Sequence, residues 1–384
     1  MENTSRPRRK RRLCTVVLII LAVLAAAVIA VAVFLKNVLT FSCPALEGQP
    51  EVGTWYAISP DGAKSSDGSE WHGLLRLGRE NKVLVYFYGG GVSLTEETSR
   101  QQDEWFFIPT VALQDHFISG GIFTNEEKNP FRDWTFLAVE YSTGDFHCGT
   151  GEYHYTDDSG LEKTVYHNGY NNYAGFIEEA KKYIGAPDTM VVAGSSAGGF
   201  ATALLTDDLI DRIPSAENVT ICVDSALLHY DDWRQTAQEL WKAPETIYEK
   251  LTTDNIVLDS LTHLRQKRGD GVKILFTSSV RDHDLQRYQA YIRDGRMESS
   301  QENSALYQRD LAKMVADMQE LLPGSGFYIW EYGMNPDDGS TQHMILPSNV
   351  FDKLQGEKSA ANWLIDAVNG DVRSYGLELL EPGA

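Results

Sequence analysis

The sequence predicts an α/β fold with a mostly parallel β-sheet flanked by helices. Several β-rich runs are apolar without alternation, among them Val83–Tyr88, Met190–Ala193 and Ile274–Phe276. Continuous apolar runs are typical of strands that are covered on both faces, as in a parallel sheet. Strand-like and helix-like segments also alternate through the second half of the chain, which is the order expected of such a sheet.

Turn residues bound each expected element. The expected strands are Trp71–Leu77, Lys82–Tyr88, Thr135–Tyr141, Thr189–Ala193, Asn218–Asp224, Val272–Ser278 and Phe327–Tyr332. The expected helices, in which apolar side chains recur at helical spacing, are Tyr173–Ile184, Ala197–Ile213, Leu285–Asp294, Ala305–Leu322 and Ala360–Val368. Residues 227–268 are helical in pattern and contain no clear strand. They are a candidate helical insertion that caps the sheet edge.

The amino terminus predicts a membrane anchor. Residues 13–35 form an uninterrupted uncharged stretch that follows the basic cluster Arg6–Arg12. A spanning helix needs about 20 apolar residues, whereas the apolar core of a signal peptide has about 7–15. By the positive-inside rule we expect a cytoplasmic tail at 1–12, a single-pass signal anchor at 13–35, a stalk at 36–52 and an extracytoplasmic domain at 53–384. The alternative is a long cleaved signal peptide and a secreted domain.

Charge narrows the class of partner. The chain has 34 Lys+Arg and 54 Asp+Glu, a formal net charge of −20, with an ordinary globular content of 42% hydrophobic residues. Residues 1–36 carry seven of the basic residues and one of the acids, so the remainder has 27 basic and 53 acidic residues, a net charge of −26. A domain with this negative charge has no general attraction for a nucleic-acid backbone. We therefore expect no nucleic-acid partner.

The four cysteines predict no disulfide-built scaffold. Cys14 lies in the expected anchor, and at most one disulfide can form among the other three. The expected pair is Cys43–Cys148. Cys222 lies in an apolar strand and is interpreted as a small buried hydrophobic residue.

A candidate nucleophile follows one of the apolar strands. Gly194–Gly198 reads Gly-Ser-Ser-Ala-Gly and fits G-x-S-x-G, with an apolar strand directly before it and a helix directly after it. That context is typical of a nucleophile elbow, a turn so sharp that its flanking positions must be glycine. The turn would expose the Oγ of Ser196 and aim the backbone N–H of Ala197 at the reacting carbonyl oxygen.

A serine nucleophile needs a base and an acid that orients the base. In chains with a nucleophile elbow, the acid and the base follow the serine in the order Ser, Asp/Glu, His, on loops at the ends of later strands. His343 lies in the loop after the last expected strand and is the candidate base. Asp282 and Asp284 both follow Val272–Ser278; Asp282 is the preferred acid and Asp284 its competitor. Asp224 ends another strand and is interpreted as structural.

A glycine-rich turn can supply the second half of an oxyanion hole. Gly89, Gly90 and Gly91 follow the strand Lys82–Tyr88, and glycine lets the backbone approach a developing oxyanion without a Cβ in the way. No Gly-Lys-Ser/Thr follows, so the turn is not a phosphate-binding loop. No His-Glu-x-x-His, Cys-x-x-Cys or EF-hand pattern appears, and we expect neither a metal nor a cofactor.

Several longer motifs make the chain resemble a known family, the pectin acetylesterases with their Notum-like carboxylesterase relatives. The resemblance extends from about Asp67 to His343. The matching segments are Asp67–Glu70, Tyr86–Gly91, Asn129–Trp134 (N-P-F-x-D-W), Tyr141–His147 (Y-C-T-G-D-x-H), His167–Gly169 and Gly194–Gly199. Ser142 departs from the family pattern, which commonly has cysteine there.

The resemblance implies an α/β-hydrolase fold and a serine carboxylesterase. The family's oxyanion hole, carried over by position, falls on the backbone of Gly90, Gly91 and Ala197. Its Ser-Asp-His triad corresponds to Ser196, His343 and an acid in Asp282–Gln286. That segment matches the family's D-x-x-Q pattern irregularly and leaves Asp282, the preferred acid, and Asp284 open. The implied substrate is an acetyl ester on a polysaccharide such as pectin. The net charge of −26 opposes the approach of polyanionic pectin unless salt screens it. The alternatives are a lipid or acyl-protein ester hydrolase and a non-catalytic surface-anchored binding module.

Overall fold

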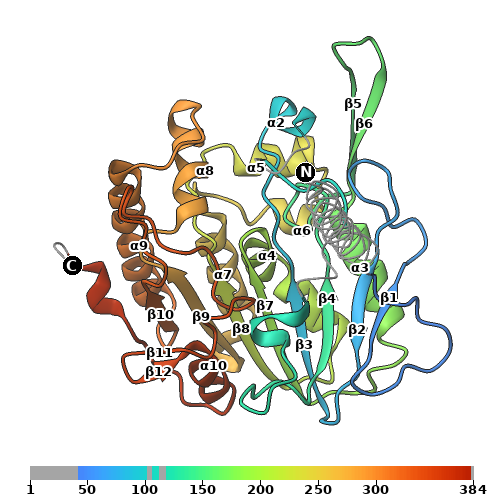
Figure 1. Cartoon of the computed structure of the whole chain (residues 1–384). Coiled ribbons are helices and arrows are strands. Elements are labelled where there is room, and N and C mark those ends of the chain that lie inside the picture. The colour runs from blue at the N-terminus through green and yellow to red at the C-terminus, as the bar shows by residue number, and fades with distance from the viewer. Residues whose placement is uncertain (1–41, 102–105, 112–117, 382–384) are drawn as a thin grey trace, which may run out of the picture. The chain divides into compact units, whose positions relative to one another are not determined.

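One mixed sheet organises the part of the chain that the structure describes (Figure 1). The structure is a computed structural model that describes residues 42–101, 106–111 and 118–381. The 8-stranded sheet has the order β1-β2-β4-β3-β7-β8-β9-β10. The pairs β1–β2 and β2–β4 are antiparallel and the other pairs are parallel. Its strands are β1 (Trp55–Ile58), β2 (Gly73–Arg76), β3 (Lys82–Phe87), β4 (Thr135–Val139), β7 (Thr189–Ser195), β8 (Asn218–Asp224), β9 (Val272–Ser279) and β10 (Gly326–Trp330).

This topology confirms the predicted mostly parallel α/β sheet. Every expected strand is present with ends shifted by a few residues, and Asn218–Asp224 coincides with β8. The central strands are covered on both faces, as their continuous apolar character predicts: Val83–Phe87 are at most 1% exposed. The short edge strand β1 was not predicted, because its apolar run is too short to be recognised.

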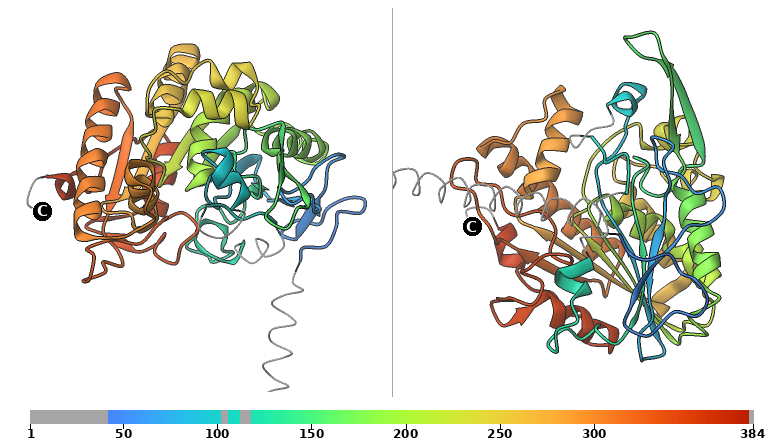
Figure 2. Two further views of the ribbon diagram at one scale, coloured as in Figure 1. Left: turned by 90° about the horizontal axis from the view of Figure 1, so that it is seen from above. Right: turned by 45° about the vertical axis from the view of Figure 1, so that its right-hand side comes forward.

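A hairpin outside the main sheet was also missed. Strands β5 (Gly151–Thr156) and β6 (Glu162–His167) pair antiparallel and project away from the main sheet (Figures 1 and 2). The signal was present, because tyrosines alternate with polar residues along β5 and the turn Asp157–Gly160 separates the two strands. A further two-stranded ribbon joins β11 (Leu354–Gln355) and β12 (Lys358–Ser359).

Helices that lie between or after the strands along the chain pack against the sheet. α4 follows β7 directly and contacts β7 and β8, α3 contacts β4, and α10 contacts β8, β9 and β10. These contacts confirm that helices flank the sheet. The α-helices are α2 (Glu96–Arg100), α3 (Gly169–Ala180), α4 (Ala197–Arg212), α5 (Trp233–Gln235), α6 (Glu245–Tyr248), α7 (Ile256–Arg268), α8 (His283–Asp294), α9 (Gln301–Leu321) and α10 (Ala360–Val368). Short 3₁₀ or π-helical segments are η2 (Gly121–Phe123), η3 (Thr236–Leu240), η4 (Gly269–Gly271) and η5 (Leu377–Leu380).

The predicted helical cap over residues 227–268 is not one unit. Its longest helix, α7, packs against α4 and contacts β9, so it is the crossover helix between β8 and β9. The buried side chains Val257, Leu261 and Leu264 require this position, because an apolar helix face must cover apolar surface. The rest of the segment consists of the short turns α5, η3 and α6.

The domain begins earlier than predicted. The expected stalk was 36–52, but Ala45 pairs with Ala57 of β1 and the N–H of Leu46 donates to the carbonyl of Ala57 at 2.9 Å. The compact unit begins at Cys43. The predicted tail and anchor, 1–12 and 13–35, lie outside the described residues. Within the described ranges, no helix is long and apolar enough to cross a membrane.

The predicted Cys43–Cys148 disulfide is wrong. The Cys148 thiol is buried in the loop after β4 and donates a hydrogen bond to the carbonyl of Phe146 at 3.1 Å. Cys43 instead adjoins the bridge to the edge strand β1. The two residues belong to different parts of the fold, which spacing along the chain cannot reveal. Cys222 is fully buried within β8, as predicted.

Candidate active site

The elbow at Ser196 has the strained backbone that its pattern predicts. Ser196 lies between β7 and α4 with φ 58° and ψ −128°, a conformation that a non-glycine residue adopts at a cost of order 1–3 kcal/mol. A Cβ at Gly198 would lie 1.8 Å from the carbonyl oxygen of Phe87, and one at Gly194 would lie 2.3 Å from that of Gly198. Both glycines are therefore required by the close packing of the turn against β3.

His343 and Asp282 meet although they are far apart in the chain. The Nδ1–H of His343 donates to both carboxylate oxygens of Asp282, each at 2.8 Å. Asp282 is fully buried, and the His343 side chain is 9% exposed. A parallel bridge between Asp282 and Thr341 holds the two loops together. The predicted base and the preferred acid are thus in direct contact.

Asp282 owes its position to the start of α8. It is the N-cap residue of that helix, and its Oδ1 accepts the backbone N–H groups of Asp284 at 3.1 Å and Leu285 at 3.0 Å. A helix N-terminus stabilises an anionic side chain through these unpaired N–H groups. The competitor Asp284 lies in the first turn of α8, where its Oδ1 accepts Nδ1–H of His283 at 2.8 Å.

Neighbouring carboxylates control the protonation of His343. Burial lowers the pKa of His343, but the charge and hydrogen bond of Asp282 and the charges of Asp284 and Asp224 outweigh burial and raise that pKa to about 9. Asp284 shows the reciprocal effect. Burial raises its pKa, but the hydrogen bond from His283 and the positive charges of His343, His283 and Arg287 lower it to about 2. The site is therefore an electrostatically coupled group of acids and histidines.

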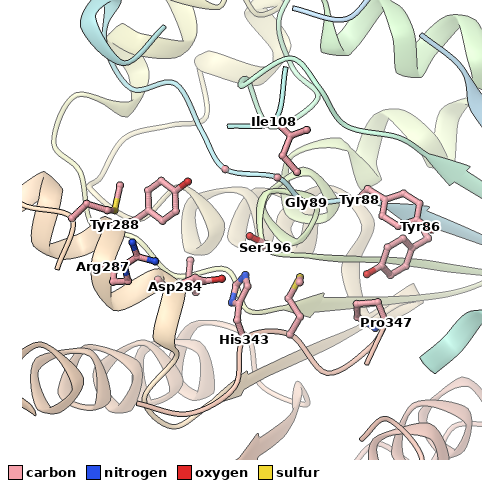
Figure 3. Close-up of a pocket in the computed structure, with 15 residues that line it drawn as sticks. Tyr86, Tyr88, Gly89, Ile108, Ser196, Asp284, Arg287, Tyr288, His343 and Pro347 are labelled. Carbon is pink, nitrogen blue, oxygen red and sulfur yellow. The ribbon is translucent and has the colours of Figure 1, made fainter. Parts of the chain in front are cut away.

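Ser196 and His343 line one cavity of about 270 Å³. Figure 3 shows both near its centre, with Asp284, Arg287 and Tyr288 on one side and Tyr86, Tyr88 and Pro347 on the other. The remaining lining residues are Gly89, Gly90, Gly91, Ile108, Leu285, Met297 and Met344. Most of these side chains are apolar or aromatic, so the cavity offers an apolar surface beside the serine.

The glycine turn lies against this cavity in a conformation that favours glycine. Gly90 has φ 156° and Gly91 has φ 86°. A Cβ on Gly91 would lie 1.9 Å from the carbonyl oxygen of Phe106. The carbonyl of Gly90 accepts from the N–H of Ile108 at 2.8 Å. Ala197 is the first residue of α4, and such a residue's N–H has no acceptor within its own helix.

The Tyr141–His147 segment holds the glycine turn through hydrogen bonds to its backbone. The Tyr141 hydroxyl donates to the carbonyl of Gly91 at 2.9 Å and accepts from the N–H of Phe146 at 3.1 Å. The Nε2–H of His147 donates to the carbonyl of Tyr88 at 2.9 Å. Burial lowers the pKa of His147 to about 4, so the ring is neutral at pH 7 and this nitrogen carries its proton. The segment is recognisable in the sequence as a motif, but its contacts with the glycine turn are not.

A buried carboxylate joins that segment to the helix before the elbow. Asp145 accepts hydrogen bonds from the Thr143 hydroxyl at 2.6 Å and from the N–H groups of Gly149 at 3.1 Å and Gly169 at 2.9 Å. His167 Nδ1–H donates to the carbonyl of Thr143 at 2.8 Å. The Tyr141–His147 and His167–Gly169 motifs therefore support the site, and none of their residues lines the cavity.

Sequence reasoning missed the wall of the cavity that α8 provides. Asp284, Arg287 and Tyr288 all line it, and they are three and four residues apart, which places them on one helix face. That spacing was available as a signal once the acid was placed at the start of the helix. Met297, which follows α8, completes this wall.

Comparisons with known proteins agree with this geometry. A family model for Pectinacetylesterase matches residues 58–283, more than half of the chain. No curated protein matches the chain. Among solved structures, the Wnt deacylase Notum from Drosophila is similar, with a TM-score of 0.60 and 14% sequence identity over 83% of this chain and 95% of that one. At this identity the likeness shows a shared α/β-hydrolase-like fold.

Proposed function

Because the chain belongs to the pectinacetylesterase family and is therefore a carboxylic ester hydrolase, we propose that it removes acetyl groups from a carbohydrate by a Ser-His-Asp mechanism. One observation carries the proposal: Nδ1–H of His343 is held by buried Asp282 in the cavity that the elbow serine lines. A non-catalytic binding module on this fold would not need that arrangement.

The proposed reaction follows from the roles of these groups. Ser196 Oγ attacks the ester carbonyl while Nε2 of His343 takes its proton, and Asp282 orients the imidazole and stabilises the imidazolium. The N–H groups of Gly90, Gly91 and Ala197 hold the tetrahedral oxyanion. The alcohol leaves with the proton from His343, and water then cleaves the acyl-enzyme by the same route.

Charge selects among acetylated polysaccharides. The chain outside residues 1–36 carries a net charge of −26, and the charged side chains Asp284 and Arg287 that line the cavity balance one another. The site therefore does not offset the repulsion of a polyanion such as pectin. We propose a neutral acetylated glycan as the substrate, met outside the cytoplasm by a domain that residues 13–35 anchor.

The apolar lining favours a second candidate, an ester with a longer acyl chain. Tyr86, Tyr88, Ile108, Leu285 and Met344 surround the serine, and a cavity of about 270 Å³ has more room than an acetyl group fills. This candidate is a lipid or acyl-protein ester hydrolase that uses the same residues. Acyl chain length separates the two candidates.

One substrate panel tests these proposals. The purified protein should hydrolyse p-nitrophenyl acetate faster than the octanoate, and acetylated xylan faster than acetylated pectin at low ionic strength. Raising the salt concentration should narrow the difference in rate between acetylated xylan and acetylated pectin, because salt screens the repulsion between pectin and the acidic domain. A preference for the octanoate would favour the second candidate. Faster release of acetate from pectin at low salt would overturn the charge argument.

The pH profile should report the carboxylates around His343. His343 must be neutral to accept a proton, so kcat/KM should rise with pH as the base, whose pKa is raised to about 9, loses its proton. Asp284→Asn removes one charge that raises this pKa, so the midpoint should move to lower pH. Asp294→Asn, at the far end of α8, is the matched control and should leave the profile unchanged. An upward or absent shift in Asp284→Asn would contradict this assignment.

A further inference from the structure

A second buried carboxylate lies beside the triad and takes no part in the proposed reaction. Asp224 ends β8 and is fully buried. Its Oδ2 accepts the Ser195 hydroxyl at 2.6 Å and the backbone N–H groups of Ile345 and Leu346, each at 3.0 Å. The carboxylate thus contacts the strand that leads into the elbow and the loop that carries His343.

Two more contacts extend this connection. The backbone carbonyl of Asp224 accepts the N–H of Ser196 at 2.9 Å. Its Oδ1 accepts the hydroxyl of Ser225 at 3.1 Å, and that hydroxyl accepts the N–H of Met344 at 3.2 Å. The backbone N–H groups of the three residues after His343 therefore all donate to the side chain of Asp224 or of Ser225.

The joined segments are strained. Ser196 has φ 58°, Ser225 has φ 52° and Met344 has φ 64°, a region that few non-glycine residues occupy. Strained residues persist where the surrounding structure over-determines them, and they cluster at functional sites. Ser225 bonds the carboxylate of Asp224 directly, and Met344 reaches it through the Ser225 hydroxyl. Ser196 bonds the backbone carbonyl of Asp224, while its neighbour Ser195 donates to the carboxylate. The Asp224 side chain therefore contacts or adjoins all three strained turns.

We propose that Asp224 is a positioning residue, whose buried carboxylate fixes the His343 loop to the elbow so that the imidazole faces Ser196. The inference rests on the proposed function, because it assigns a role beside the Ser196–His343 pair. Asp224 is not a second triad acid. Its oxygens are occupied by other donors, and Nδ1–H of His343 is bonded to Asp282.

The chemistry of the site explains why an acid is used here. A buried carboxylate is costly unless donors satisfy it, and hydrogen bonds to an ionised acceptor are about twice as strong as neutral ones. Burial raises the pKa of Asp224, and the bonds from Ser195, Leu346 and Ile345 together with the charge of His343 offset only part of that rise. One side chain that accepts several donors at once can hold a short loop in a strained conformation.

Graded substitutions test this role. Asp224→Ala should lower kcat for p-nitrophenyl acetate about 100-fold with KM nearly unchanged, because a displacement of about 1 Å at a catalytic group costs about this much. Asp224→Asn should recover most of the loss, since an amide oxygen can accept the two backbone N–H groups and its NH₂ can donate to Ser225. Ser225→Ala removes the Met344 contact and the hydroxyl's own bond to Asp224 but leaves the Ile345 and Leu346 contacts, and should cost about tenfold.

A carboxylate elsewhere provides the matched control. Asp208 accepts hydrogen bonds from Tyr170, Tyr173 and Arg212, so Asp208→Ala should lower the thermal midpoint without lowering kcat. Equal kcat in Asp224→Ala and the wild type would overturn the proposal, as would equal losses in Asp224→Ala and Asp208→Ala. If Asp224→Ala does not fold, Ser225→Ala decides: a wild-type kcat overturns the proposal and a tenfold loss supports it.

Hydrogen exchange separates this inference from the proposed function. Backbone amides of residues 344–346 should exchange faster in Asp224→Ala and Ser225→Ala than in Asp208→Ala, whether or not the protein hydrolyses the ester. Unchanged exchange of these amides in both Asp224→Ala and Ser225→Ala would overturn the proposal that Asp224 holds the His343 loop. A wild-type protein without esterase activity, but with the expected exchange, would overturn only the proposed function.

Discussion

Replacing Ser196 by alanine should lower kcat for p-nitrophenyl acetate by about 10⁴–10⁶-fold, the usual cost of removing a triad member. The alanine variant keeps the elbow but has no oxygen to form the acyl-enzyme. Steady-state hydrolysis by equal amounts of folded wild type and variant measures the effect. A fluorophosphonate probe should label the wild type at Ser196 and leave the variant unlabelled.

A matched serine shows that the loss is specific. Ser260 is buried in α7, and within the described ranges its hydroxyl has no hydrogen-bond partner. Ser260→Ala should therefore keep the wild-type kcat and the labelling at Ser196. Equal rates in the wild type and Ser196→Ala would exclude Ser196 as the nucleophile, and labelling of another residue would identify its replacement.

Asp282→Asn should lower kcat by about 10⁴-fold, whereas Asp284→Asn should stay within about tenfold of the wild type at its optimal pH. Both oxygens of Asp282 accept Nδ1–H of His343 at 2.8 Å. An amide at this position can present N–H to the ring and favour the wrong tautomer. Asp284 instead bonds His283 and acts on His343 only through its charge.

We expect Asp282→Asn to keep helix α8 intact, so that a loss of activity in this variant reports on the contact with His343. Asparagine is as good an N-cap residue as aspartate, so Asp282→Asn should retain the start of α8 and the circular dichroism spectrum of the wild type. Rates measured across the pH range compare the two variants. A larger loss in Asp284→Asn than in Asp282→Asn would make Asp284 the triad acid.

Local pattern was sufficient for the parts of this protein that the chain builds from neighbouring residues. The elbow at Ser196 and the turn Gly89–Gly91 need particular residue types at fixed spacing, because the backbone must turn sharply or come close. The buried strands follow from continuous apolar runs, and the order of strands and helices follows from their alternation. His343 was predicted as the base from the order Ser, Asp/Glu, His and from its place in the loop after the last expected strand.

Contacts between distant segments decided the rest. Asp282 and Asp284 follow the same strand, and only the capping of α8 turns one of them toward His343. The apolar face of α7 is equally compatible with a cap and with a crossover helix until its partner, α4, is known. The pairing of cysteines likewise depends on where two loops lie in space.

Asp224 shows the division most clearly. In the sequence it is an acid at the end of an apolar strand, a position open to a structural or a catalytic role. In the fold its carboxylate meets backbone N–H groups of residues 345 and 346 and the hydroxyl of Ser195. Backbone N–H groups carry no side-chain signature, so no sequence pattern marks them as partners. Residues that are close in the chain were enough to predict the fold class and the order of the candidate catalytic residues. Which carboxylate meets His343 depends on how distant segments approach each other in the fold, and spacing along the chain does not encode that approach.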